Sequence, residues 1–349
     1  MTVSDALVVN TGSTSVKLTR VRDGNLVAPP ASLDDALADT GETPNLVIHR
    51  VVHGGDRTGA AILNDDVMAE LHALTELAPL HQPAALDAVQ RCRRRWPAAT
   101  QIACFDTSFH ATMPPDAHTY ALPARLRAKI KVYGFHGLSY AWSARVIARA
   151  RPAARRVLVA HLGGGQSLCG MVDGASVVTT MGFTPLDGLV MATRSGTIDP
   201  GALLWLTEHT DEDVGVVLDE ESGLRGMAGT GDMKAIVDRS AANDRAASLA
   251  LAVWLHRFLR QAGGCIAVLG GLDALVFTGG IGERSPAIRT LVCDRLAWLG
   301  VRLAPTAPTS GSDSDMLDLS TRDAEVRTLV VPAREDLQML HEAQALLSL

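Results

Sequence analysis

RVLVAHLGGGQSLCGMVDG, residues 156–174, has the pattern of a strand, a glycine-rich turn and a second strand. The apolar run before the turn and the alternation after it are typical of neighbouring strands joined by a tight connection. LVVNTGSTSVKLTRV, residues 7–21, repeats this pattern near the N-terminus. A hairpin that occurs twice indicates two related halves facing one another. The sequence therefore predicts an α/β protein in which each half contains one such hairpin.

Both turns carry residue types that can surround phosphate oxygens. The turn Asn10 to Ser15 offers backbone N–H groups and hydroxyls, and the other turn contains Gly163, Gly164 and Gly165. Neither is a Walker A loop, because the pattern G-x-x-x-x-G-K-[ST] is absent. A plain hairpin turn is the alternative for each one alone, with Lys17 as a solvated strand residue. Two such turns together favour a nucleotide site.

Length and composition limit the class of protein. A chain of 349 residues is long enough for two domains, and its net charge of −6 provides no basic surface for nucleic acid or an anionic membrane. The five cysteines form no C-x-x-C pair, which argues against a disulfide framework or a thiolate zinc site. We recognise no signal peptide and no apolar run of the ~18 residues that a membrane span needs. We expect a cytoplasmic protein with no nucleic-acid or membrane partner.

A long irregular segment, MGFTPLDGLVMATRSGTIDPG, occupies residues 181–201, and glycine and proline interrupt every regular pattern in it. Irregular segments of more than roughly 12–15 residues inside a compact chain are usually functional. Arg194 stands there among small hydroxyl and glycine residues, so its planar guanidinium has room to face a carboxylate or a phosphate. The alternative is an ordinary surface arginine in a long loop.

Two charged residues accompany predicted strands of the N-terminal half. Arg50 follows the apolar run 46–48 and needs a partner or a ligand there, with a structural salt bridge as the alternative. Asp106 follows the predicted strand 101–105, and ligands of open α/β sheets gather at the carboxyl ends of strands. An Asx turn or a helix cap is the alternative for Asp106. Further along, His136 stands between two glycines.

The C-terminal half contains further candidate elements. A predicted strand at 274–277 leads into the glycine turn TGGIGER, residues 278–284, and then into a helix capped by Ser285, which together suit an anion or a nucleotide. A long helix is predicted at 246–262, with Leu249 facing the core. Glu335 begins the last predicted helix, where the helix dipole favours negative charge, so capping is the alternative to a role in binding.

In order along the chain, several motifs resemble those of the acetate kinase family, within the sugar kinase, Hsp70 and actin superfamily. The motifs are VVNTGSTSVKL, HRVVHGG, LAPLHQP, CFDTSFHATMP, YGFHG, HLGGG, FTGGIGE and VVPAREDL, and they cover nearly the whole chain. The resemblance implies two similar actin-like, ribonuclease H-like domains with mixed sheets that flank a nucleotide cleft. It implies an N-terminal domain of residues 1–150 plus 336–349 and a C-terminal nucleotide-binding domain of residues 151–335. It also implies a homodimer.

The activity that the resemblance implies is reversible phosphoryl transfer from ATP to acetate, giving acetyl phosphate and ADP, with Mg²⁺ or Mn²⁺ as the metal. In this resemblance Asn10 and Glu335 hold the metal, and Arg50 binds the acetate carboxylate. The implied catalytic residues are Asp106, His136 and Arg194. The implied apolar acetate pocket consists of Val52, Leu80, Phe135 and Pro185. The residues implied to bind ATP are Lys17, His161, Leu162, Gly163, Gly164, Gly165, Asp232, Met233, Lys234, Gly280, Ile281, Gly282, Glu283 and Arg284.

The chain departs from the family pattern on the nucleotide side. Gly164 and Arg284 stand where the family usually has asparagine, and Lys234 stands where it has arginine. These changes bear on the phosphoryl donor more than on the acid. A propionate or other short-chain carboxylate kinase is the alternative of the same class, because one methylene group discriminates by only ~1–3 kcal/mol. A non-catalytic nucleotide-binding relative and a phosphohydrolase are the alternatives from other classes.

Overall fold

The computed structural model describes residues 5–12, 16–39, 41, 43–79, 81–127, 129–305 and 315–347. The chain divides into two units, each with a six-stranded mixed sheet. The first unit consists of Met1–Ala111, Phe135–Trp142 and Arg334–Leu349, and the second of Thr112–Gly134 and Ser143–Ala333. The predicted α/β class with two similar halves is confirmed. The domain boundaries drawn from the resemblance stay a prediction.

The first sheet has the strand order β3-β2-β1-β4-β6-β5. Its strands are β1 (Asp5–Thr11), β2 (Val16–Arg22), β3 (Asn25–Val27), β4 (Leu46–Val51), β5 (Ala61–Ile62) and β6 (Thr100–Phe105). β1 pairs antiparallel with β2 and parallel with β4, and β4 pairs parallel with β6. Because β1, β4 and β6 run in the same direction, Asn10, Arg50 and Asp106 lie at the same edge of this sheet.

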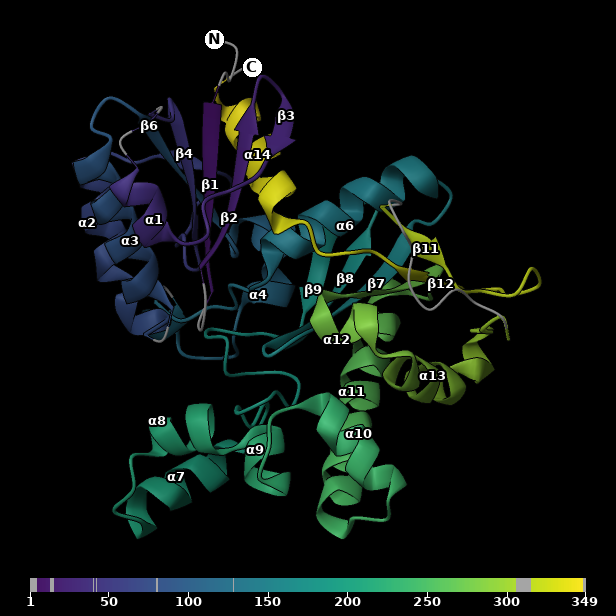
Figure 1. Ribbon diagram of the computed structural model, residues 1–349. Helices are drawn as coiled ribbons and strands as arrows, with labels where there is room; N and C mark the ends of the chain where they lie inside the picture. The colour runs from purple at the N-terminus through teal and green to yellow at the C-terminus, as the bar shows by residue number, and fades with distance from the viewer. Residues whose placement is uncertain are drawn as a thin grey trace. The chain divides into compact units, whose positions relative to one another are not determined.

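Alternate side chains of β1 face opposite sides of the first sheet. Leu7 and Val9 belong to a buried cluster with residues of α1 (Leu33–Ala38) and α3 (Gln82–Arg95). Ala6 and Val8 belong to another cluster with residues of α14 (Glu335–Leu346). Figure 1 shows α1, α2 (Asp65–Ala73) and α3 on one side of this sheet and α14 on the other. Helices on both faces explain why β1 is apolar on both sides.

The second sheet repeats the first in strand order and in strand direction. Its order is β11-β12-β10-β7-β8-β9. The strands are β7 (Arg156–Leu162), β8 (Gln166–Val172), β9 (Ala175–Thr179), β10 (Ala274–Thr278), β11 (Leu317–Asp318) and β12 (Arg327–Val330). β7 pairs antiparallel with β8 and parallel with β10, as β1 does with β2 and β4. The hairpin repeated in the sequence is thus the first hairpin of each sheet.

The remaining helices belong wholly or largely to the second unit. They are α4 (Pro115–His118), α5 (Ala124–Arg127), α6 (Gly137–Ala150), which begins in the first unit, α7 (Pro200–His209), α8 (Val214–Val216), α9 (Gly223–Ala228), α10 (Met233–Ala241), α11 (Arg245–Leu269), α12 (Gly279–Arg284) and α13 (Pro286–Arg295). Shorter helical turns are Thr75–Leu77, Ser108–Thr112, Ala297–Leu299 and the π-helical turn Val217–Glu221. None of the helices in the described ranges is long and apolar enough to cross a membrane.

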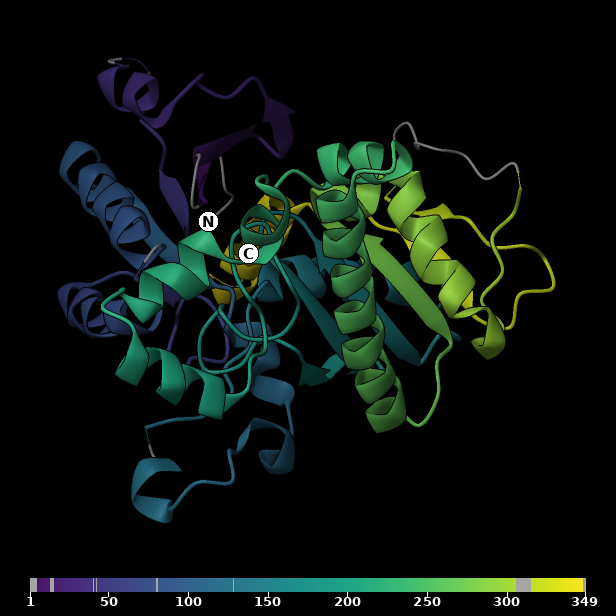
Figure 2. The same cartoon turned by 90° about the horizontal axis from the view of Figure 1, so that it is seen from below.

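The long helix α11 packs along the second sheet and is the long green helix of Figure 2. Its buried face includes Ala250, Trp254 and Phe258, which are four residues apart. The prediction that Leu249 faces the core is wrong, since that side chain is 60% exposed. The helix also continues beyond the predicted end at residue 262, through two glycines, to Leu269.

Candidate active site

Arg50 and Asp106, which lie at the ends of neighbouring parallel strands, form a buried ion pair. Arg50 Nη2 lies 2.5 Å from Asp106 Oδ2, and Arg50 Nε lies 3.1 Å from Asp106 Oδ1. The side chain of Asp106 is only 1% exposed, and that of Arg50 is 12% exposed. This two-point contact holds the guanidinium plane in one orientation at the edge of the sheet.

The electrostatic surroundings of this pair include Glu335. Burial raises the pKa of the Asp106 carboxyl, while the Arg50 guanidinium opposes that shift and the Glu335 carboxylate adds to it. Burial alone would lower the pKa of Arg50, but the carboxylates of Asp106 and Glu335 raise it above its ordinary value. The guanidinium therefore stays charged in this buried position, where it can bind a carboxylate.

Asn10 and Glu335 form the second part of the same polar cluster. Asn10 Nδ2 donates a hydrogen bond to Glu335 Oε2 at 2.8 Å. Asn10 lies near the end of β1, and Glu335 is the first residue of α14. Four of the predicted site residues are thus brought together in the first unit, although 325 positions separate Asn10 from Glu335. Lys17 is exposed on β2 and stands opposite Asn10 in the pairing of β1 with β2.

The oxygen atoms of Asn10 and Glu335 fit Mg²⁺. This ion prefers hard oxygen ligands, and proteins usually hold it through one or two carboxylates together with waters and substrate phosphates. Among the residues described, no group of three or more His, Cys, Asp and Glu side chains could hold a metal ion. A metal at Asn10 and Glu335 would accordingly depend on ligands from the substrate and from water. These two ligands stay a prediction.

His136 stands immediately before α6 in an unusual backbone conformation. Its φ is +59°, a region that non-glycine residues seldom adopt. The next residue, Gly137, donates its N–H to the backbone oxygen of Asp106 at 2.8 Å. His136 is therefore anchored, through the backbone, to the residue that pairs with Arg50. Such conformations persist where the surrounding structure enforces them, often at functional sites.

The predicted acetate pocket is divided between the two units. Val52 and Phe135 are buried in the first unit, and the Phe135 ring contacts His53 edge to face with 5.7 Å between ring centroids. Pro185 belongs to the second unit. Leu80 lies outside the described residues. The pocket as a whole stays a prediction.

The glycine turn of the second unit is open around Gly164. Gly163 N–H donates to Gly165 O at 3.0 Å, and a Cβ atom added at Gly164 would have no neighbour within 4 Å. His161 is half-buried at the end of β7, whereas the side chain of Leu162 is fully buried in the core. Leu162 could therefore contact a nucleotide only through its backbone atoms.

The segment predicted as the second glycine turn forms the short helix α12 instead. Gly279 has a φ of +76°, and a Cβ atom there would lie 2.8 Å from Leu162 O, so only glycine fits. A Cβ atom at Gly280 would lie 2.6 Å from Arg284 Nη2, which shows that the guanidinium folds back over the helix. Buried Arg289 donates to the oxygens of residues 282 and 283 and so fixes the end of α12.

The predicted nucleotide-binding residues at the start of α10 have three different environments. Asp232 caps the helix by accepting a hydrogen bond from Lys234 N–H at 2.9 Å. Met233 is buried in the core of the second unit. Lys234 Nζ lies 2.6 Å from Asp238 Oδ2 at an exposed position. A nucleotide phosphate would have to compete with Asp238 for the ammonium group.

Arg194 is held by a residue that no sequence motif singled out. Its Nε donates to Asp219 Oδ1 at 2.7 Å, and its Nη1 lies 3.4 Å from Pro185 O. The same loop contacts the glycine turn, because Ala192 N–H donates to Gly164 O at 3.2 Å. Within the second unit, the loop that contains both Pro185 and Arg194 is therefore hydrogen-bonded to the glycine turn. A cavity of about 220 Å³ lies beside this loop and is lined in part by Ser195 and Gly196.

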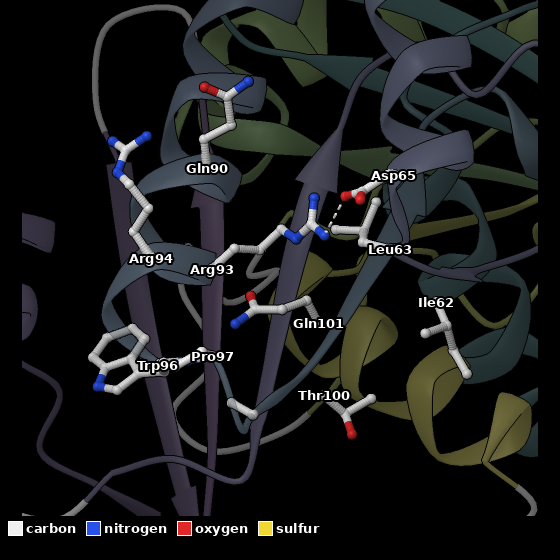
Figure 3. Close-up of a pocket in the computed structure, with 11 residues that line it drawn as sticks. Ile62, Leu63, Asp65, Gln90, Arg93, Arg94, Trp96, Pro97, Thr100 and Gln101 are labelled. Carbon is white, nitrogen blue, oxygen red and sulfur yellow. Dashed lines mark hydrogen bonds and ion pairs between the residues drawn. The ribbon is translucent and has the colours of Figure 1, made fainter.

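A cavity of about 610 Å³ in the first unit is separate from the predicted site residues. It lies at the start of β6, whereas Asp106 follows the other end of that strand. Figure 3 shows Arg93 directed toward the carboxylate of Asp65, with Nη2 and Oδ1 2.8 Å apart. This ion pair lies on the solvent-exposed face of α3 and is not part of the candidate site.

The sequence and the fold of this chain are similar to those of known proteins. A family model described as the acetokinase family matches residues 30–341. Acetate kinase of Rhodopseudomonas palustris is 44% identical over 300 residues, which cover 83% of this chain and 74% of the relative. The crystal structure of Porphyromonas gingivalis acetate kinase has a TM-score of 0.86 at 28% identity, over 99% of this chain and 100% of that one. A propionate kinase from Francisella tularensis has a TM-score of 0.87 at 32% identity, over 97% and 98%.

Proposed function

Since the chain belongs to the acetokinase family, we propose that it transfers the γ-phosphoryl group of ATP to acetate, giving acetyl phosphate and ADP. The observation that carries the proposal is the buried cluster of Asn10, Arg50, Asp106 and Glu335 at one edge of the first sheet. A binding-only protein has little use for a charged, doubly held guanidinium beside two oxygen ligands suited to Mg²⁺.

The proposed chemistry needs alignment and charge neutralisation more than covalent help from the protein. An acetate oxygen forms a bond to the γ-phosphorus while the bond from that phosphorus to the bridging β-oxygen breaks, and ADP leaves with that oxygen. Arg50 is proposed to bind the acetate carboxylate through the guanidinium N–H groups that its two hydrogen bonds to Asp106 leave over. His136 and Arg194 are proposed to donate hydrogen bonds to the phosphoryl oxygens as their negative charge grows.

Asp106 needs no role as a strong base, because acetate is already ionised near neutral pH. Its two oxygens engage Nε and Nη2 of Arg50, so we propose that Asp106 holds the acetate-binding guanidinium in place. Asn10 and Glu335 are proposed to hold Mg²⁺, which when bound neutralises charge on the phosphates. The open turn at Gly164 and the folded-back Arg284 are proposed to contact ATP.

Acetate is the proposed acid because the relative of 44% identity is an acetate kinase. Propionate is the second candidate, favoured by the likeness to a propionate kinase at 32% identity. One methylene group changes binding by only ~1–3 kcal/mol, so either acid is compatible with a pocket of this kind.

An acyl-phosphate trapping assay tests the proposal. The purified chain is incubated with Mg²⁺, ATP and hydroxylamine, with acetate, propionate or butyrate in parallel. Hydroxamate should form fastest with acetate and should disappear when EDTA removes the metal. A higher rate with propionate would favour the second candidate. Phosphate release without any acid would indicate a phosphohydrolase, and no product from folded protein would indicate a non-catalytic relative.

We also propose a homodimer, supported by the apolar surface of α7. No side chain of α7, all of whose residues are described, is buried, and Leu204 and Trp205 are 66% and 56% exposed. Adjacent exposed apolar side chains of this size are typical of protein interaction sites. Light scattering should give twice the mass of one chain, and the variant Trp205→Glu should shift it toward that of one chain. A single-chain mass for the unaltered protein would contradict this.

A further inference from the structure

The loop that carries Arg194 rests on the π-helical turn Val217–Glu221. Ser195 N–H donates to the backbone oxygen of Leu218 at 3.0 Å, and Thr193 Oγ1 donates to that of Asp219 at 2.7 Å. π-Helical turns are rare and occur frequently at functional sites. In this protein, two carbonyl groups of the turn bind the residues on either side of Arg194.

Asp219 also binds Arg194 through its side chain. The bond from Arg194 Nε to Asp219 Oδ1 is 2.7 Å long, and both side chains are mostly buried, at 12% and 26% exposure. Nη1 of the same guanidinium lies 3.4 Å from Pro185 O. Because the guanidinium is planar, contacts at Nε and at Nη1 together fix the direction in which the group faces.

The backbone of the loop is held just as firmly by the start of α9. Gly223 has a φ of +62°, and a Cβ atom there would clash with Met191 O and lie 2.7 Å from Arg194 O. Leu224 N–H donates to Met191 O at 2.9 Å. The backbone of the loop is thus packed closely against the start of α9, whereas the Arg194 side chain can still rotate. That rotation is what Asp219 restrains.

We infer that Asp219 is a positioning residue, which holds the Arg194 guanidinium in the orientation that stabilises the transferring phosphoryl group. This inference rests on the proposed function. A donor that is oriented before the reaction needs no reorganisation when negative charge develops, which is the main source of electrostatic catalysis. Asp219 acts through Arg194 and not on the substrate, so its loss should lower kcat and leave the KM for ATP almost unchanged.

The variant Asp219→Ala is expected to lower kcat by about 10²-fold, because a displacement of about 1 Å in a catalytic group has an effect of that size. Asp219→Asn keeps an oxygen that can accept from Nε, and it should retain more activity than the alanine variant. Glu220→Ala is the matched control, since Glu220 is an exposed carboxylate on the same turn. This control should keep the kcat of the unaltered protein.

A double-mutant cycle separates positioning from a general structural effect. In the background Arg194→Ala, the further change Asp219→Ala should cause no additional loss of kcat. An equal loss in both backgrounds would overturn the inference. So would an Asp219→Ala variant with full kcat. Where the alanine variant does not fold, Asp219→Ser takes its place, because its short hydroxyl admits water but does not reach Nε. If the unaltered protein makes no acyl phosphate, the proposed function has failed rather than this inference.

Discussion

Replacement of Asp106 with asparagine is expected to lower kcat for acetyl phosphate formation by about 10²–10³-fold, the usual effect of removing one electrostatic group from an active site. The Asp106 carboxylate receives both Nε–H and Nη2–H of Arg50. Asparagine offers one acceptor oxygen, and its NH₂ group cannot accept from the guanidinium. Arg50 would keep its charge but lose its fixed orientation, so acetate would bind in a less productive geometry.

The matched control is a second ion pair of the same geometry in the same unit. Asp5 receives Nε–H of Arg20 at 2.9 Å and Nη2–H at 2.6 Å, and both side chains are buried. Asp5 lies at the start of β1, at the far end of the strand from Asn10. Asp5→Asn should lower the urea midpoint of unfolding without changing kcat. Full activity in Asp106→Asn would remove Asp106 from the proposed site.

Replacement of Gly137 with alanine is expected to destabilise the first unit by at least about 3 kcal/mol, the upper range for inserting one carbon into a packed site. The added Cβ atom would clash with the backbone oxygen of Asp106 and would lie 2.9 Å from Phe109 Cβ. Since Gly137 N–H donates to that same oxygen, the start of α6 cannot move away without losing the hydrogen bond. A backbone oxygen, unlike a long side chain, has no other rotamer.

Urea unfolding followed by circular dichroism measures this effect. Gly59→Ala is the control, because a Cβ atom at Gly59 would meet nothing within 4 Å. The control should change stability by less than about 1 kcal/mol, in either direction. If Gly137→Ala unfolds at the same urea concentration as the control, the close approach of α6 to Asp106 does not constrain the fold.

Local patterns in the sequence predicted most of the strands and several helix ends. The helix cap at Ser285 occurs where the sequence places it. The repeated hairpin predicted two related halves, and both sheets contain it. These features were predictable because they depend on neighbouring residues: the spacing of apolar side chains, a capping hydroxyl and a turn between two strands.

The errors occurred where tertiary packing outweighs local preference. The helix predicted at 246–262 continues through Gly263 and Gly264, because Cys265 and Ile266 lie beyond them and pack into the core. Each glycine costs roughly 1 kcal/mol in a helix, less than such burial contributes. Residues 279–284, predicted as a glycine turn, form α12 instead. This helix lies directly between β10 and α13 in the chain, so tertiary structure on both sides determines its conformation.

The sequence by itself determined the family, the repeated α/β architecture and the types of residue that the proposed chemistry needs. Only the tertiary structure decided which of them meet. Arg50 and Asp106 are 56 positions apart and pair because β4 and β6 are parallel neighbours. Asp219 gave no signal in the sequence, because its role depends on its distance from Arg194 and not on its neighbours in the chain. Periodicity and motifs describe residues close in sequence, whereas hydrogen bonds form between atoms close in space.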